Sequence, residues 1–214
     1  MFVKNYMSSN LITITPDTTV IKALDLMREH DIHRLPVVVN GQLQGLVTES
    51  IIAKHSPSTA TSLSVHELNY LLNKTTAQDI MIKQVVTVAP DALLEQAAVL
   101  MRTKNLGVLV VVEDNRPVGI ITDKDVFDAF IDVSGYFVPG TRIVIELQTD
   151  RAGIMEDMGH LFNKANLNVP QIALYHVNDS VQMVLHVDTQ DGEAVRQQLE
   201  AAGYKVTSVV VKPE

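Results

Sequence analysis

The residues from 7 to about 126 contain one structural unit twice. Alignment of residues 7–52 with residues 81–126 needs no gap, and every matched pair is 74 positions apart. Chance similarity does not hold a single offset across some 46 residues, so the chain carries a duplication. The matched pairs include Met7 with Met81, Pro16 with Pro90, Met27 with Met101, Gly45 with Gly119, and Thr48 with Thr122.

Both copies predict the same order of elements. A short β-rich run ends at a proline, an amphipathic helix follows, and two β runs joined by a polar turn lead into a second helix. Asn40–Gly41 favours a tight hairpin in the first copy. We therefore expect an α/β fold of two βαββα units, at residues 1–60 and 79–134, that pack together because neither buries its sheet alone.

Two further segments follow different patterns. Residues 61–78 contain the capping pair Ser64 and Glu67, which predicts a linker helix between the copies. Residues 140–214 predict the order βαββαβ, an α+β arrangement of the ferredoxin-like type. In its central hairpin, we expect His176 to face Val181 and His186 to face Gln171.

Composition narrows the class of protein. The 214 residues carry a formal net charge of −8, which disfavours a protein that grips nucleic acid through its phosphates. The absence of cysteine excludes disulfides and thiolate metal sites. No apolar run approaches the roughly 18 residues that span a bilayer, and the N-terminus has no apolar signal core. We expect a soluble cytoplasmic protein that binds neither nucleic acid nor membrane.

The second copy resembles a CBS (cystathionine-β-synthase) domain in its runs TVAPDALLEQAAVLM, VLVVV and PVGIITDKDV. Two such repeats in tandem resemble a Bateman module, and the resemblance covers roughly residues 1–130. It implies a non-enzymatic regulatory protein that binds AMP, ADP, ATP or a related adenosine compound in the cleft between its repeats. The lack of a Ser/His/Asp constellation, a P-loop or G-x-G-x-x-G agrees with a chain that has no catalytic residues.

The junction of a predicted strand and helix supplies the candidate nucleotide site. Gly119, Thr122 and Asp125 match the motif G-h-h-T-x-x-D of the CBS family. The backbone N–H groups at the helix start attract phosphate, the Thr122 hydroxyl donates a hydrogen bond, and the Asp125 carboxylate accepts both ribose hydroxyls. Gly119 lets the backbone come close. The alternative is that Thr122 and Asp125 only cap the helix, worth about 1 kcal/mol each.

Other positions complete or weaken this site. By resemblance, the backbone at Thr87 and Val88 lines the adenine pocket, and His33 and Arg34 offer a basic group to the phosphates. The alternative for Arg34 is a solvated side chain on a turn. Ile51 stands where the second copy has its acid, so we expect the first site to be weak or empty. His30 and His33 lack a carboxylate-rich motif, and we expect no metal.

The third segment resembles an ACT domain. In TDRAGIMEDMGHLF, Asp150 and Gly153 match the family's first loop and Ala152 replaces its proline; in ANLNVPQI, Asn168 matches. The resemblance implies an amino acid bound by the loop that Asp150, Ala152, Gly153 and Ile154 form with Asn168, across a dimer interface. The changed proline bears on ligand binding more than on the fold.

A CBS pair followed by an ACT domain is the layout of the acetoin-utilisation AcuB family. This resemblance implies a homodimer that regulates an unknown target protein, linked to acetoin utilisation. Two alternatives stay open. Ile51 and Ala152 favour a structural or interaction protein with degenerate ligand sites. The family resemblance also suits a regulatory subunit of a metabolic enzyme.

Overall fold

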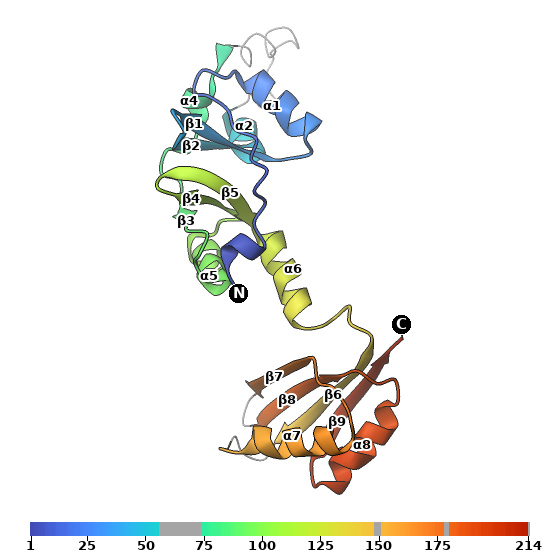
Figure 1. The fold of residues 1–214 in the computed structure, drawn as a ribbon. Coiled ribbons are helices and arrows are strands. Elements are labelled where there is room, and N and C mark those ends of the chain that lie inside the picture. The colour runs from blue at the N-terminus through green and yellow to red at the C-terminus, as the bar shows by residue number, and fades with distance from the viewer. Residues whose placement is uncertain (56–73, 148–150, 178–179, 214) are drawn as a thin grey trace. The chain divides into compact units, whose positions relative to one another are not determined.

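The computed structural model describes residues 1–55, 74–147, 151–177 and 180–213. The chain forms two compact units, Met1–Phe127 and Asp128–Glu214, and each is described by itself (Figure 1). The predicted capping pair Ser64 and Glu67, and Asp150 of the predicted ligand loop, lie outside the described residues. Of the described helices, none is long and apolar enough to cross a membrane.

The N-terminal unit contains both copies of the repeat, and the helix that ends the second copy continues into the C-terminal unit. The first copy consists of α1 (Val20–Glu29), β1 (Arg34–Val39), β2 (Gln42–Thr48) and α2 (Glu49–His55). The second consists of β3 (Thr87–Val88), α5 (Leu94–Lys104), β4 (Val108–Glu113), β5 (Arg116–Thr122) and α6 (Asp123–Val133). A short turn of helix leads each copy: η1 (Val3–Asn5) and α4 (Ala77–Ile80).

The hairpin of each copy turns through two residues with positive φ. Asn40 and Gly41 have φ of 51° and 78°, and β1 pairs antiparallel with β2, as the sequence predicts. Asp114 and Asn115 occupy the equivalent places between β4 and β5, with φ of 49° and 62°. Two successive left-handed residues match the right-handed twist of the strands, which is why Asn, Asp and Gly stand there.

The predicted first strand of each copy is much shorter than its β-rich run. In residues 11–15, Ile14 forms a single parallel bridge with Val37. Ile14 N donates to Pro36 O at 3.0 Å, and Ile14 O accepts from Val38 N at 2.8 Å. Its counterpart β3 has two residues. The predicted short β run is therefore present as one bridge in the first copy and as a two-residue strand in the second.

Each copy sends its leading segment to the other. Val3 N donates to Ala92 O at 3.0 Å in the second copy, and Ala77 N donates to Thr18 O at 2.8 Å in the first. The two hydrogen bonds are related by the same offset of 74 residues as the sequence repeat. The duplicated units therefore exchange equivalent backbone contacts, and neither copy is complete without the other.

The same exchange continues at the edge of each hairpin. Ser8 forms an antiparallel bridge with Ile120 of β5, and Ile82 forms the equivalent bridge with Leu46 of β2. Both bridges carry two backbone hydrogen bonds of 2.9 to 3.0 Å. The leading segment of the first copy is thus fixed beside the strand that ends at Thr122.

The C-terminal unit is a four-stranded antiparallel sheet with two helices. Its sheet order is β7-β8-β6-β9. The order along the chain is βαββαβ, as the sequence predicts. The elements are β6 (Gly140–Leu147), α7 (Ile154–Lys164), β7 (Gln171–Val177), β8 (Ser180–Val187), α8 (Gly192–Ala201) and β9 (Lys205–Lys212).

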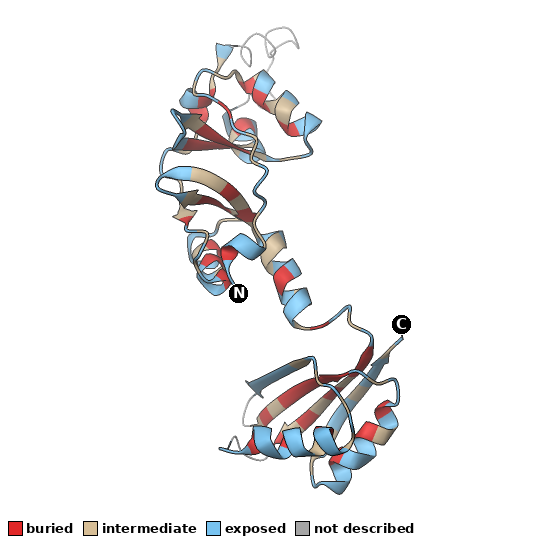
Figure 2. Ribbon diagram, viewed as in Figure 1, coloured by how far each residue is buried: buried red, intermediate tan, exposed pale blue. Residues whose placement is uncertain are grey.

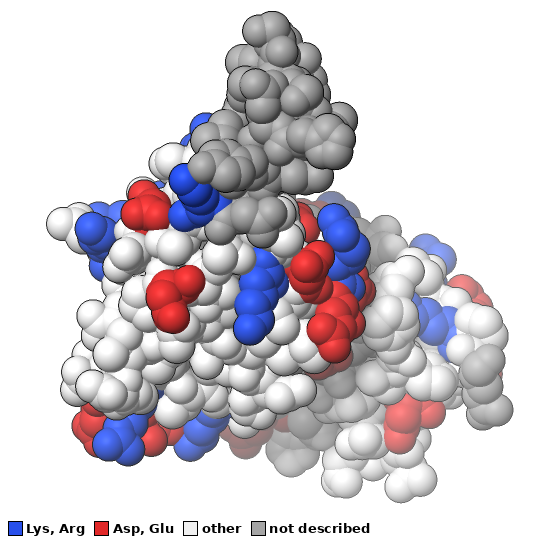
Figure 3. Space-filling view, turned by 90° about the horizontal axis from the view of Figure 1, so that it is seen from above, with Lys and Arg blue, Asp and Glu red and all other residues white. Residues whose placement is uncertain are grey.

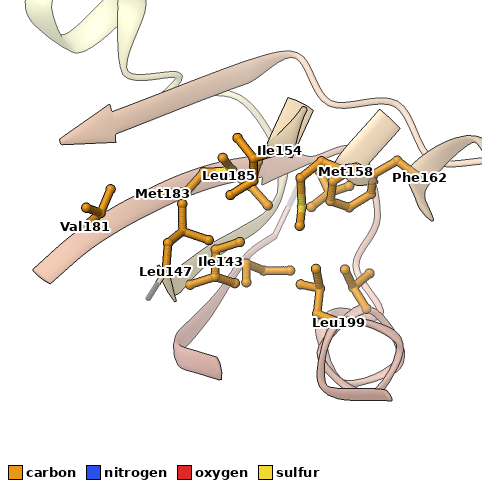
Figure 4. Packing of buried hydrophobic residues seen from close by; sticks show 12 residues of the cluster. Ile143, Leu147, Ile154, Met158, Phe162, Val181, Met183, Leu185 and Leu199 are labelled. Atoms are coloured by element: carbon orange, nitrogen blue, oxygen red, sulfur yellow. The ribbon is translucent and has the colours of Figure 1, made fainter. Parts of the chain in front are cut away.

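The core of this unit lies between the sheet and its helices. Alternate residues of β6 and β8 point to α7 and α8, among them Ile143 and Leu185, which are fully buried (Figures 2 and 4). Met158 and Phe162 of α7 and Leu199 of α8 fill the space from the helix side. Both helices lie on one face of the sheet (Figure 1).

The predicted pairing of the central hairpin is confirmed. His176 pairs with Val181 and His186 pairs with Gln171 in the register of β7 and β8. His186 lies on the opposite face from Leu185, because successive side chains of a strand alternate. It is nevertheless only 2% exposed.

Candidate ligand cleft between the two repeats

A cavity of about 180 Å³ lies where the leading segment of the first copy passes the end of β5. Both copies contribute to it, since the Ser8–Ile120 bridge holds them together here. The residues that line it are Ser8, Asn10, Leu11, Ile12, Asp31, Ile32, His33, Arg34 and Pro36 from the first copy, and Ile120 and Thr122 from the second.

Thr122 and Asp125 form a capping box at the start of α6. Asp125 Oδ2 accepts from Thr122 N at 2.6 Å and from Thr122 Oγ1 at 2.8 Å, and Asp125 N donates to Thr122 Oγ1 at 3.4 Å. The capping role that the sequence allowed is therefore present. Within the described chain, the second carboxylate oxygen, Oδ1, has no hydrogen-bond partner. One acceptor thus stays available for a ribose hydroxyl.

The backbone amides at the start of α6 are already partnered. Thr122 N and Asp125 N belong to the capping box, Asp123 N donates to Gly107 O at 3.3 Å, and Lys124 N donates to Asp123 Oδ1 at 3.0 Å. The expectation of exposed N–H groups for a phosphate was wrong in this structure. The acidic side chains that follow Thr122 satisfy those donors, as side chains at helix starts commonly do.

Gly119 lies in close contact with the leading segment of the chain. A Cβ placed on it would lie 2.5 Å from Met7 Sδ and 3.1 Å from Ser8 O. Gly45 of the first copy faces Met81 and Ile82 in the same way. The glycine therefore makes room for the exchanged leading segment of the chain, and this contact is sufficient to require a glycine.

Arg34 joins the first copy to the second at the edge of the cleft. Its Nη2 donates to Gly107 O at 3.5 Å. A Cβ placed on Gly107 would lie 3.5 Å from Arg34 Nη2 and 3.5 Å from Asp123 Oδ2, so both charged groups lie beside this glycine. Neighbouring His33 pairs through Nδ1 with Glu49 Oε2 at 3.0 Å. Both members of that pair are more than half exposed, so it contributes at most about 1 kcal/mol.

Thr87 and Val88 lie elsewhere. They form β3, pair with Val110 and Val111, and are not among the residues that line the cleft. The leading segment of the first copy, with Leu11 and Ile12, takes that place instead. Sequence reasoning missed these residues because the exchange of leading segments has no signature within either copy.

The first copy has no carboxylate at the position equivalent to Asp125, where Ile51 stands. Thr48 Oγ1 accepts from Ile51 N at 3.2 Å and shares a hydrogen bond with Ser50 Oγ at 2.9 Å. Ile51 itself packs against the apolar core of this copy. The Ile51 side chain cannot accept a ribose diol as the Asp125 carboxylate can.

The predicted loop of the C-terminal unit is described only in part. Gly153 has φ of 87° and precedes α7, whereas Ile154 is buried in the core. Arg151 forms an ion pair with Asp157 over the first turn of the helix. Asn168 is exposed, and its N–H donates to Asp188 Oδ1 at 3.0 Å.

Neither a metal cluster among the described residues nor a patch of one charge on the face of Figure 3 marks a binding site. Over the described residues, no group of three or more His, Asp or Glu side chains could hold a metal ion. On the face drawn in Figure 3, basic and acidic side chains are interspersed among uncharged residues.

Comparison with known proteins assigns the two copies. The family model for the CBS domain matches residues 3–58 and 77–132. A CBS domain-containing protein of Dictyostelium discoideum is 34% identical over 135 residues, which make up 62% of this chain and 93% of that protein.

Two solved structures resemble the N-terminal part. The CBS domain pair of protein MJ0100, in complex with 5′-methylthioadenosine and S-adenosyl-L-methionine, is 30% identical, with a TM-score of 0.50 over 61% of this chain and 95% of that chain. A Vibrio cholerae protein assigned to acetoin utilization (AcuB) is 28% identical, with a TM-score of 0.53 over 64% of this chain and 95% of that chain.

Proposed function

Since the chain belongs to the CBS-domain family, we propose that it is a non-enzymatic regulatory sensor whose CBS pair binds an adenosine compound. The observation that carries this proposal is the free Oδ1 of Asp125, whose hydrogen-bond partner Thr122 lines a cavity built from both copies. The capping box holds this carboxylate in place through its other oxygen, so the acceptor is positioned before the ligand arrives.

The cleft matches the parts of an adenosine. Asp125 Oδ1 would accept the ribose hydroxyls at the end of β5. Ile12 and Pro36 offer apolar surface to the base, which suits a planar aromatic ring. Arg34 would face the substituent on the 5′ carbon.

The partnered amides of α6 bear on which adenosine compound binds. A phosphate cannot use those N–H groups unless it displaces their present acceptors, so Arg34 and His33 would have to hold it. A phosphate-free adenosine meets no such requirement. The related pair of MJ0100 was solved with two such compounds, 5′-methylthioadenosine and S-adenosyl-L-methionine. We therefore include these compounds with AMP, ADP and ATP as candidate ligands.

The size of the cleft suggests how binding becomes a signal. Its volume of about 180 Å³ is below the range of roughly 300–1,000 Å³ that small-molecule sites occupy. An entire adenosine would then fit only if the two copies shift against each other. A ligand that favours the shifted arrangement changes its population, and a partner protein can respond to that change.

The C-terminal unit would supply the second input. We propose an ACT-like, ferredoxin-type domain that binds an amino acid at the loop of Asp150, Ala152 and Gly153, together with Asn168, across a homodimer. The likeness to the Vibrio cholerae protein supports a link to acetoin utilisation, either directly or as a regulatory subunit of a metabolic enzyme. The proposal includes the division of the chain into two CBS repeats (residues 1–60 and 79–134), a linker helix (residues 61–78) and the ACT-like domain (residues 140–214). It also includes a cytoplasmic location.

A second candidate is an interaction protein whose CBS pair binds nothing. The partnered amides and the small cavity favour it. Thermal unfolding with AMP, ADP, ATP, 5′-methylthioadenosine and S-adenosyl-L-methionine separates the two. At about 100 times its dissociation constant, a ligand stabilises the folded chain by about 2.7 kcal/mol. If none of the five compounds raises the unfolding temperature, the interaction protein is the better account.

A further inference from the structure

The C-terminal unit has a cavity of its own, on the face of the sheet that α7 and α8 leave open. Its volume is about 360 Å³, within the roughly 300–1,000 Å³ typical of small-molecule sites. The residues used below are the apolar Phe130, Val133 and Val184 and the polar Arg142, Gln171 and His186.

Two polar atoms at this cavity are buried without a hydrogen-bond partner. They are Gln171 Oε1 and His186 Nδ1, on residues that pair directly between β7 and β8. His186 is only 2% exposed. A buried polar atom without a partner is rare in folded proteins, and two of them together indicate a place where a polar ligand can bind.

Both of these atoms need a donor. His186 Nε2 lies 3.1 Å from Pro139 O, and a carbonyl can only accept, so Nε2 carries the hydrogen. In the neutral ring, Nδ1 then has a free lone pair. Gln171 Oε1 is likewise an acceptor. A ligand that satisfies these two atoms therefore presents at least one hydrogen-bond donor.

The cavity also has an unbalanced positive charge. Arg142 pairs with His186 in the register of β6 and β8, and it forms no ion pair among the residues that the structure describes. Burial, and secondly the charge of Arg142, lower the pKa of Lys212. The local field therefore favours an anion.

We propose that this cavity binds a small 2-hydroxycarboxylate with an apolar side chain. Its carboxylate pairs with Arg142, its hydroxyl donates to Gln171 Oε1 or His186 Nδ1, and its side chain packs on Phe130, Val133 and Val184. A hydroxyl fits better than an ammonium group because Arg142 and Lys212 repel a further cation.

This site is separate from the loop in the proposed function. Arg142 is the third residue of β6, whereas that loop follows Leu147 at the other end of the strand. The helix that follows the loop, α7, packs on the opposite face of the sheet from this cavity. Failure of the nucleotide proposal would leave this one untouched.

Calorimetric titration of the full chain with mandelate tests the assignment. We expect mandelate to bind, and phenylacetate, mandelamide and inorganic phosphate to bind at least about tenfold more weakly, because each lacks the hydroxyl, the charge or the apolar group. Absence of mandelate binding, or equal affinity for phenylacetate, would overturn the proposal. Tighter binding of phenylglycine than of mandelate would overturn the choice of a hydroxyl over an ammonium group.

Matched variants locate the site. Arg142→Gln should lower the affinity for mandelate about tenfold or more. Arg196→Gln, at an exposed position of α8, should leave that affinity unchanged. Gln171→Leu removes an unpartnered oxygen, so this variant should stay folded and still lose affinity. If mandelate binds both Arg142→Gln and Gln171→Leu as tightly as the original chain, the cavity is not its site.

Discussion

Met7 lies against Gly119, so that a Cβ at position 119 would fall 2.5 Å from the methionine sulfur and 3.1 Å from Ser8 O. The side chain can move, but the backbone of the exchanged segment must give as well. We expect Gly119→Ala to lower the free energy of unfolding by about 1–3 kcal/mol, the usual cost of overpacking. Urea unfolding, followed by circular dichroism, measures this loss.

A helical glycine without close neighbours provides the control. Gly159 of α7 has nothing within 4 Å of an added Cβ, so Gly159→Ala should stabilise by about 0.5–1 kcal/mol. The contact itself is tested by Met7→Ala combined with Gly119→Ala, which should cost less than the sum of the single changes. Simple additivity would show that the two residues do not interact.

Arg34 should distinguish a phosphate-bearing ligand from one without phosphate. A hydrogen bond to a charged group is worth about 1.5–3 kcal/mol, so Arg34→Gln should lower the affinity for AMP about tenfold or more. Binding of 5′-methylthioadenosine should change little. Arg28→Gln is the matched control, because Arg28 is 79% exposed on α1 and pairs only with Asp25 at 3.8 Å. Equal losses for both ligands would mean that Arg34 acts through its bond to Gly107 and not on phosphate.

The capping box at α4 predicts a dependence of stability on pH. The Thr76 hydroxyl and N–H both donate to Asp79, at 2.7 and 2.8 Å, and these hydrogen bonds lower the pKa of its carboxyl. A pKa lowered by folding stabilises the folded chain above the unfolded pKa, and that stabilisation disappears as the pH falls through the folded value. Asp79→Asn should therefore be less stable than the original chain at pH 7, with a difference that shrinks below about pH 4.

Removal of one donor checks the cause of this shift. In Thr76→Ala, the pKa of the Asp79 carboxyl should rise toward its ordinary value, as NMR titration of the side chain would show. An unchanged pKa would mean that the hydroxyl is not responsible.

The sequence predicts the fold well where local chemistry and alternation decide it. The left-handed pair Asn40–Gly41 and the pairing of His176 with Val181 both follow from short patterns, and the structure has both. The offset of 74 residues predicts the duplication itself.

The sequence predicts the site less completely, because the site depends on contacts between the copies. Thr122 and Asp125 could be found from their motif, but the place of Ile12 in the cleft depends on the bridge from Ser8 to Ile120. Gly119 shows the same limit. Its residue type is required by Met7, 112 positions earlier in the chain, and no local pattern reveals that neighbour.

Asp125 and Asp79 form nearly identical capping boxes, but Thr122, the partner of Asp125, lines the cleft, and Thr76, the partner of Asp79, does not. Replacement of either by alanine removes a cap, whereas only Asp125 offers an oxygen to the ribose. Calorimetric titration of AMP and 5′-methylthioadenosine into both variants therefore tests the central claim most directly. We expect Asp125→Ala to lower the affinity for the compound that binds by at least about tenfold, and Asp79→Ala to retain the original affinity. Equal affinities in the two variants would contradict the assignment of Asp125 to the ligand.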